Sequence, residues 1–152
     1  MANTQSMCTS FMGELLTGTH NFTTGTGDTF KAALYLSSAT LNASTTAYSA
    51  TGEVTGTGYT AGGVTVTNGT SPTSTNTSST AGTAYWTPSA SLSYTSVTLT
   101  TAFNCVLIYN SSKSNKAVSV HTFGDQTITA GTFTLTMPSN TTSTALLRLA
   151  TT

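Results

Sequence analysis

The sequence is nearly devoid of charge. Its 152 residues include four acidic and four basic side chains, which give a formal net charge of zero. The whole stretch from Val54 to Ser112 carries no charged residue. A nucleic-acid-binding protein needs a basic surface that displaces counterions from phosphates, so this composition argues against nucleic acid as a partner. Charged residues are depleted at the cores of protein interfaces, so a neutral surface is typical of a subunit that packs against other subunits.

Cysteine is scarce, and long apolar runs are absent. Cys8 and Cys105 can form at most one disulfide, which is not the framework of a small secreted protein. No run approaches the roughly 18 apolar residues that span a membrane, so we expect no membrane partner. The first residues lack the basic and apolar regions of a signal peptide. We therefore expect a protein that is made in the cytoplasm and is not exported through such a signal.

Side chains suited to catalysis or metal binding are few. The candidates are His20, His121, Cys8, Cys105, Glu14, Asp28, Glu53 and Asp125. Zinc needs clustered nitrogen and sulfur ligands and calcium needs clustered carboxylates, and neither spacing occurs. Cys105 and His121 can face each other from neighbouring strands, but Cys105 alternates with apolar residues, which favours an inert core thiol. We predict no catalytic residue, no metal and no cofactor.

A glycine-rich stretch, GEVTGTGYTAGGVTVTN, occupies residues 52–68. A dinucleotide-binding loop requires G-x-G-x-x-G at the start of a helix. Here the glycine after Gly56 and Gly58 is Gly62, one position too late, and a strand-like VTVTN follows. Gly63 is followed by valine and not by the lysine of a phosphate-binding P-loop. We therefore predict a structural turn at Gly56, Gly58, Gly62 and Gly63, where glycine permits positive φ.

Aliphatic hydroxyls are what the sequence has in abundance, with 39 threonines and 20 serines. Threonine is β-branched and favours strands, whereas strong helix formers such as Glu, Lys and Arg are rare. Short alternating segments recur between turn residues, as in sandwiches and barrels. We predict a single all-β domain over residues 1–152, an antiparallel β-sandwich or barrel-like fold with one short N-terminal helix.

Three segments carry more specific predictions. Apolar residues at helical spacing predict a helix over residues 4–17, namely Met7, Phe11, Met12, Leu15 and Leu16. Residues 69–83 contain no apolar residue except Ala81, which predicts a mobile Ser/Thr loop. Both faces of the segment at residues 103–109 are apolar, which predicts a central strand with neighbours on both sides.

The apolar face of the predicted helix and several aromatic residues are candidates for contact with a partner. A helix this short is not stable alone, so we expect Phe11 and Leu15 to dock on the sheet or on a second subunit. Tyr59 and Trp86 are further interface candidates, because amphipathic aromatic residues are common at interfaces and at core edges. Such aromatic residues also suit sugar stacking, so a glycan-binding module stays an alternative.

Several segments resemble a family of small tailed-bacteriophage virion proteins, and they occur in the family's order. The matching segments are ELLTGTHNF, DTFKAALYLSSATL, TTAYSATGEVTGTGYTAGGVTVTN, VLIYNSSKSNKAVSVHTFG and TITAGTFTLTMP. The glycine-rich segment is the most distinctive. The loop at residues 69–83 and the hydroxyl-rich run at residues 87–101 depart from the family's pattern, so the resemblance assigns no partner contact there.

The resemblance implies a non-enzymatic, β-rich virion component and brings no catalytic motif. A capsid decoration (cement) protein on the capsid surface is the function that we expect, with a tail, neck or fibre component as the alternative. The expected partners are the major capsid protein and further copies of the chain in a homo-oligomer, a trimer or a dimer. The protein would be made in the host cytoplasm and be located in the virion.

Overall fold

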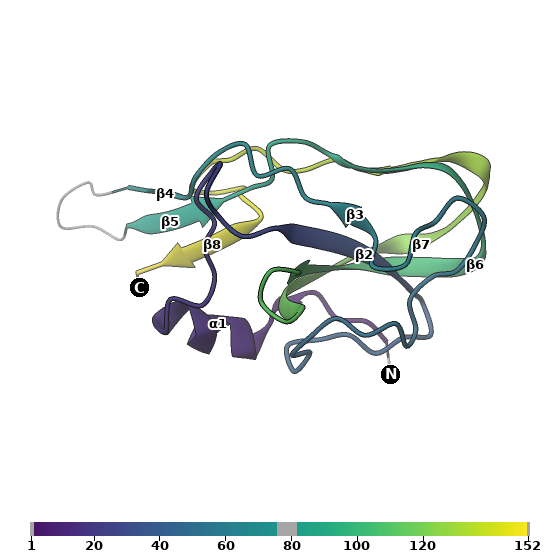
Figure 1. Cartoon of the computed structure of the whole chain (residues 1–152), viewed down its shortest axis with the longest axis horizontal. Coiled ribbons are helices and arrows are strands. Elements are labelled where there is room, and N and C mark those ends of the chain that lie inside the picture. Colours follow the sequence, from purple (N-terminus) through teal and green to yellow (C-terminus); the bar gives the residue numbers. More distant parts are fainter. Residues whose placement is uncertain (1, 76–81, 152) are drawn as a thin grey trace.

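The computed structural model describes residues 2–75 and 82–151, which form mainly antiparallel strands (Figure 1). In chain order the elements are β1 (Ser6–Met7), α1 (Thr9–Leu16), β2 (Phe30–Leu36), β3 (Val64–Thr65), β4 (Thr73–Ser74), β5 (Thr83–Trp86), β6 (Leu92–Asn110), β7 (Lys116–Leu135) and β8 (Leu147–Ala150). The prediction of an all-β fold with one short helix is confirmed. The arrangement is sandwich-like, and the described strands do not close into a barrel.

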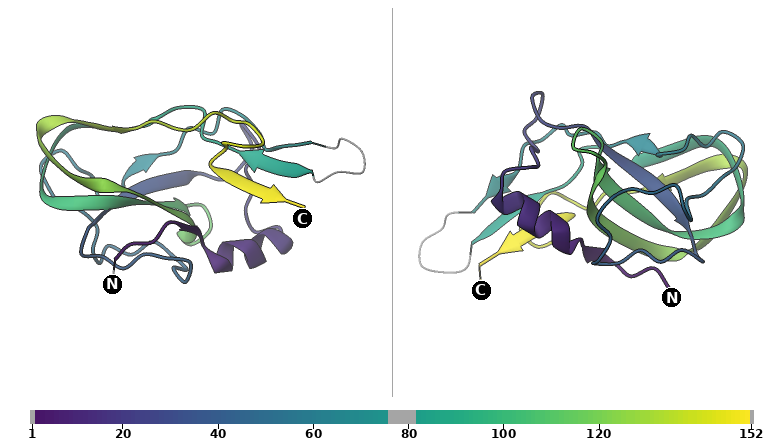
Figure 2. Two further views of the ribbon diagram at one scale, coloured as in Figure 1. Left: turned by 180° about the vertical axis from the view of Figure 1, so that it is seen from behind. Right: turned by 60° about the horizontal axis from the view of Figure 1, so that its bottom comes forward.

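Two sheets organise the described strands. The larger has the order β1-β7-β6-β2-β3, and the smaller has the order β4-β5-β8. All the pairings are antiparallel. Figure 2 shows the small sheet at one end of the molecule, with α1 lying beside it.

The strands β6 and β7 form a single long hairpin that carries the larger sheet. Their pairing runs from Leu92 with Leu135 to Asn110 with Lys116, and its register shifts at several points. Near two of these shifts, Ser96 and Ala130 adopt positive φ, as residues at β-bulges often do. Bulges bend a strand, and the hairpin curves strongly at its far end (Figure 1). The Tyr94 hydroxyl, near the start of β6, consequently reaches the carbonyl oxygen of Ala32 in β2 at 2.9 Å.

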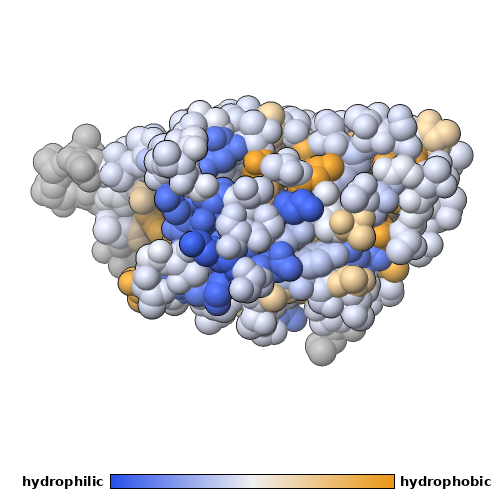
Figure 3. All heavy atoms as spheres, viewed as in Figure 1, coloured by the Kyte–Doolittle hydropathy of each residue, from blue (hydrophilic) through white to orange (hydrophobic). Residues whose placement is uncertain are grey.

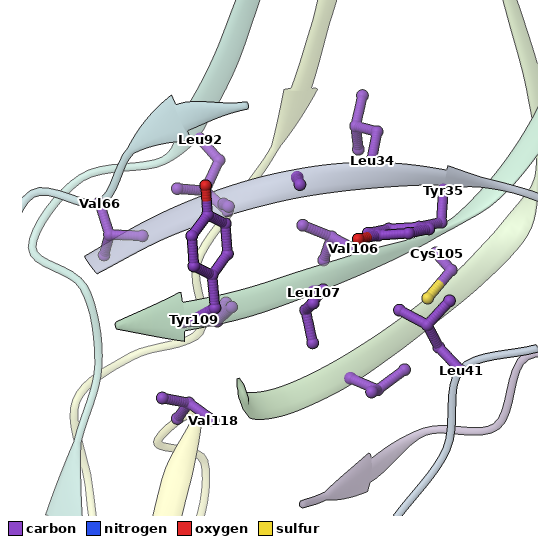
Figure 4. Close-up of a cluster of buried hydrophobic side chains, with 14 of the residues drawn as sticks. Leu34, Tyr35, Leu41, Val66, Leu92, Cys105, Val106, Leu107, Tyr109 and Val118 are labelled. Atoms are coloured by element: carbon purple, nitrogen blue, oxygen red, sulfur yellow. The ribbon is translucent and has the colours of Figure 1, made fainter. Parts of the chain in front are cut away.

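The core occupies both faces of the sheet around β6. This strand lies between β7 and β2, so the prediction that the segment at residues 103–109 is central is confirmed. Val106 and Leu107 point to opposite faces and are 2% and 0% exposed. Figure 4 shows Leu34 on one side of the sheet and Leu107 with Leu41 on the other. Strands buried on both faces read as continuous apolar runs, as this segment does.

The helix prediction was wrong at its N-terminal end. Residues 4–8 are extended, and α1 begins only at Thr9. The Asn3 side chain bonds to Leu36 O, Asn104 Oδ1 and the backbone N–H of Leu41, so it does not cap a helix. Ser6 and Met7 pair with β7 instead. The helix ends at Leu16, and Gly18 follows with a φ of 67°.

The prediction of a loop over residues 69–83 was wrong for Thr73, Ser74 and Thr83, which lie in strands. Thr73 and Ser74 form β4 and pair with Tyr85 and Ala84 of β5. The Thr75 backbone N–H also donates to the carbonyl oxygen of Thr83 at 3.0 Å. Residues 76–81 lie outside the described residues. The sequence pattern did not indicate the pairing of β4 with β5, because short strands of exposed Ser and Thr carry no apolar alternation.

Truncating Leu107 should therefore destabilise the fold strongly. Leu107 is fully buried in the central strand. We expect Leu107→Ala to lower the free energy of unfolding by about 2–5 kcal/mol, measured by urea denaturation. Leu16→Ala is the matched control, because Leu16 is 91% exposed, and it should change stability by less than about 0.5 kcal/mol in dilute solution. A loss below about 1 kcal/mol for Leu107→Ala would contradict the central position of this strand.

Candidate functional site: an apolar groove between the helix and the small sheet

The glycine-rich stretch packs its backbone against the protein's own strands. A β-carbon built on Gly56 would overlap the carbonyl oxygen of Thr98, and one on Gly58 would overlap that of Ser96. Thr57 bridges to Thr98 of β6 between these two glycines. Gly58, Gly62 and Gly63 all have positive φ. The glycines thus let a turn lie directly on β6 and β2, and β3 follows them in place of a helix.

The same stretch surrounds one buried carboxylate, that of Glu53. Its Oε1 accepts hydrogen bonds from the Tyr59 hydroxyl at 2.8 Å and from the Gly62 backbone N–H at 2.7 Å. Its Oε2 accepts a hydrogen bond from the Tyr48 hydroxyl at 2.6 Å. Glu53 is 5% exposed, and a buried carboxylate needs such donors to offset its desolvation. The anion that this glycine-rich loop holds is therefore a side chain of the protein itself.

Adding a methyl group at Gly63 should test this packing. A β-carbon there would overlap the carbonyl oxygen and the backbone of Ala32, and the φ of 73° is unfavourable for alanine. Gly18 is the matched control, because its φ is 67° but nothing lies within 4 Å of its β-carbon position. We expect Gly63→Ala to cost about 3 kcal/mol or more and Gly18→Ala about 1 kcal/mol, by urea denaturation. Equal costs would contradict the close approach.

A second polar cluster ties α1 to the long hairpin. Glu14 of α1 accepts a hydrogen bond from Lys116 Nζ at 2.5 Å and lies 2.7 Å from His20 Nε2. The Asn110 amide oxygen accepts the backbone N–H of Ser112, which leaves Nδ2 to donate to His20 Nδ1 at 3.0 Å. His20 Nδ1 is then an acceptor, and Nε2 donates to Glu14. Both carboxylate oxygens of Glu14 therefore have a donor in this network.

Asp28 and Lys113 extend this cluster. Asp28 Oδ2 accepts hydrogen bonds from Asn110 Nδ2 and from the backbone N–H of Asn21, and Lys113 Nζ lies 3.7 Å from Oδ1. Partial burial opposes ionisation of both Asp28 and Glu14, but the hydrogen bonds and the nearby lysines prevail, so both pKa values are below their ordinary range. The cluster contains four of the eight charged side chains, Glu14, Asp28, Lys113 and Lys116. These side chains pair with one another within the protein.

The two thiols are buried, whereas His121 is partly buried and its Nε2 lies 2.9 Å from the Ser119 hydroxyl. Burial raises the pKa of Cys8 to about 11 and that of Cys105 to about 12, and both cysteines are free. Both thiols therefore remain protonated at neutral pH, whereas the thiolate is the nucleophile. Burial lowers the pKa of His121 to about 4. Within the described part of the chain, no group of three or more His, Cys, Asp or Glu residues is placed to hold a metal ion.

Burial of His121 predicts a specific dependence of stability on pH. Between pH 6.5, the ordinary pKa of histidine, and about pH 4, His121 is protonated in the unfolded chain but neutral in the folded chain. Stability should therefore fall as the pH is lowered through this window, by up to about 1.4 kcal/mol per pH unit. His121→Gln should reduce that slope, measured by urea denaturation at a series of pH values. Identical slopes for the two chains would contradict a partly buried, neutral His121.

An apolar groove lies between α1 and the small sheet. Phe11 and Leu15 form the helix side, and Trp86, Leu147 and Leu149 form the sheet side of a hollow of about 100 Å³. On the sheet, Trp86 pairs directly with Leu147, and Ala84 pairs with Leu149. None of the residues that line the groove is charged.

Aromatic contacts hold the two walls of this groove together. The Phe22 ring lies 4.8 Å from that of Trp86 and 6.0 Å from that of Phe11, between centroids. The indole N–H of Trp86 faces Asn68 Oδ1 and the carbonyl oxygen of Thr70, so its polar edge is satisfied inside the protein. The apolar part of the ring lines the groove.

Apolar side chains at the rim of the groove stay in contact with solvent. Three large apolar residues of the described chain are exposed: Met12 at 45%, Leu16 at 91% and Leu149 at 47%. All three belong to α1 or β8, the elements that border the groove. Figure 3 shows apolar surface at this end of the molecule, next to a strongly hydrophilic patch. Exposed apolar surface rimmed by polar residues is typical of an interaction site.

The structure brings three of the four predicted interface residues together. Phe11, Leu15 and Trp86 all line the groove, although they come from distant parts of the sequence, and Phe11 and Trp86 are core residues that are each 2% exposed. Tyr59 lies apart from them, where its hydroxyl accepts the backbone N–H of Leu34 and donates to Glu53. Leu147 and Leu149, which alternate with Arg148 in β8, were not among the predicted interface residues.

Comparison with known proteins adds no relative. Neither the family models, nor the curated proteins, nor the solved structures gave a match to this chain. Among the described residues, no helix has the length and apolar character needed to cross a membrane.

Proposed function

We propose that this chain is a non-enzymatic structural protein of a tailed-bacteriophage virion, a capsid decoration (cement) protein that stabilises the head shell. Its partners are further copies of the chain and the major capsid protein, and it lies on the capsid surface. The observation that carries the proposal is the uncharged groove beside α1, whose bordering elements hold all the large apolar side chains of the described residues that remain exposed.

Segment resemblance supports the virion part of the proposal. The segments around Glu14, Glu53 and Asn110 belong to those that resemble small virion proteins, and each contributes to a buried or partly buried polar contact of this fold. The resemblance of these segments is what supports a virion component.

The distribution of charge supports a role in assembly. A cement protein works in many copies, so that weak contacts sum by avidity. Each copy must then cover neighbours without burying unpaired charge. The chain carries only eight charged side chains, and Glu14, Asp28, Glu53 and Asp125 all accept internal hydrogen bonds. Most of its surface is consequently neutral and rich in hydroxyl groups.

The arrangement of the tyrosines does not favour the glycan-binding alternative. The hydroxyls of Tyr35, Tyr48, Tyr59, Tyr94 and Tyr109 all donate to acceptors within the protein. A hollow of about 430 Å³ has hydroxyl-bearing walls, but its single aromatic residue, Tyr35, is 2% exposed. A sugar platform needs an exposed aromatic face, which this hollow does not offer.

Particles made without the protein should test the proposal. A ligand that binds the assembled shell stabilises it by mass action, so we expect such particles to assemble but to release DNA at a lower temperature. Release is followed with a DNA-binding dye during heating. Adding the purified chain back should restore the original release temperature.

Two outcomes would count against the cement role. An unchanged release temperature in particles that lack the protein would contradict it. A copy number set by the tail symmetry, with the protein found only at the tail vertex, would identify a tail, neck or fibre component instead. Quantitative mass spectrometry of purified particles gives this copy number relative to the major capsid protein.

A further inference from the structure

Asn68 is the one asparagine in the sequence that a glycine follows. Such a pair is prone to spontaneous deamidation, because glycine has no side chain to hinder its backbone nitrogen from attacking the neighbouring side-chain amide. Only glycine fits at position 69, since a β-carbon there would overlap Ser89 Oγ. The packing of Ser89 therefore requires glycine in a pair that is chemically labile.

Hydrogen bonds hold both reacting groups of this pair. Asn68 Nδ2 donates to the carbonyl oxygen of Phe22 at 2.8 Å, and Asn68 Oδ1 accepts the indole N–H of Trp86 at 3.0 Å. Because an indole N–H only donates and a carbonyl oxygen only accepts, the orientation of this amide is fixed. The backbone N–H of Gly69, whose nitrogen is the nucleophile of the reaction, donates to Ser89 Oγ at 2.9 Å. The amide and the attacking nitrogen are thus held by different parts of the chain.

We propose that Asn68 is a site of deamidation that the folded structure protects. The reaction occurs when the segment between β3 and β4 leaves Ser89 and Trp86, and not while these contacts are made. The nitrogen of Gly69 then bonds to Cγ of Asn68 and loses its proton, and Nδ2 leaves as ammonia. Water opens the resulting succinimide to aspartate or isoaspartate. The inference goes beyond the proposed function and does not depend on it.

The product of this reaction does not fit the folded arrangement. A carboxylate at position 68 has no hydrogen to donate, so two oxygens would face each other where Asn68 Nδ2 now meets the carbonyl group of Phe22. The Phe22 ring is stacked on that of Phe30 and packs edge-on against that of Trp86, so the lost hydrogen bond lies next to the aromatic core. Modification therefore prevents the segment from closing as before.

Peptide mapping by mass spectrometry of the full chain, incubated in mildly alkaline buffer, tests the protection. We expect the chain unfolded in urea to deamidate at Asn68 at least about tenfold faster than the folded chain, which reacts only while the segment is open. Ser89→Ala removes the acceptor of the Gly69 N–H and should raise the rate in the folded protein at least about twofold. Ser91→Ala, at another exposed position of the same run, is the matched control and should leave the rate unchanged. Equal rates in the folded and unfolded chains, or in Ser89→Ala and the wild-type chain, would overturn the inference.

The effect of the product is tested with Asn68→Asp. We expect this variant to lower the Tm of the full chain by about 3 °C or more at neutral pH, measured by circular dichroism. Asn42→Asp is the matched control, because it adds the same charge but Asn42 Oδ1 accepts hydrogen bonds from the Ser44 backbone N–H and hydroxyl, as a carboxylate also does. This control should keep the original Tm. An unchanged Tm for Asn68→Asp would show that the product fits the fold and would contradict the proposal.

Discussion

The pairing of β6 with β7 is the constraint on which the rest of the structure depends. The two strands pair along nearly their whole lengths, and bulges bend them so that one hairpin contributes to both sides of the core. The other parts attach to it: β2 and β1 pair along its two edges, the glycine-rich turn lies on its bulge at Ser96, and α1 is tied to Lys116 at the start of β7. Because residues 105–110 of β6 are buried on both faces, the register of this part fixes the positions of the strands beside it.

The few charges of the chain are used to fix connections between segments. Glu14 joins α1 to β7, Asp28 joins the segment before β2 to the end of β6, and Glu53 closes the glycine-rich turn. Asp125 accepts hydrogen bonds from Ser37 and Asn104. A carboxylate with several donors is stable where a lone one is not, so these contacts specify geometry while they leave the exterior neutral. The exposed apolar rim of the groove is then the main feature that distinguishes one part of the surface from another.

Much of the fold could be predicted from the sequence, because apolar patterning reports burial directly. The continuous apolar run around Leu107 identified the central strand, and the failed glycine spacing excluded a phosphate loop. Met7 misled the helix prediction, because helical spacing does not reveal that Asn3 and β7 hold this segment extended. The contact between His20 and Asn110 spans 90 residues, and no local pattern encodes it. Phe11 and Trp86 were predicted only as separate interface candidates, and the groove that they line with β8 depends on tertiary pairing.

A cryo-electron microscopy map of the intact particle tests the central claim most directly, that this fold is a neutral assembly module of the capsid surface. The account predicts density for the fold at repeated positions over the head. Density confined to the tail vertex would contradict it.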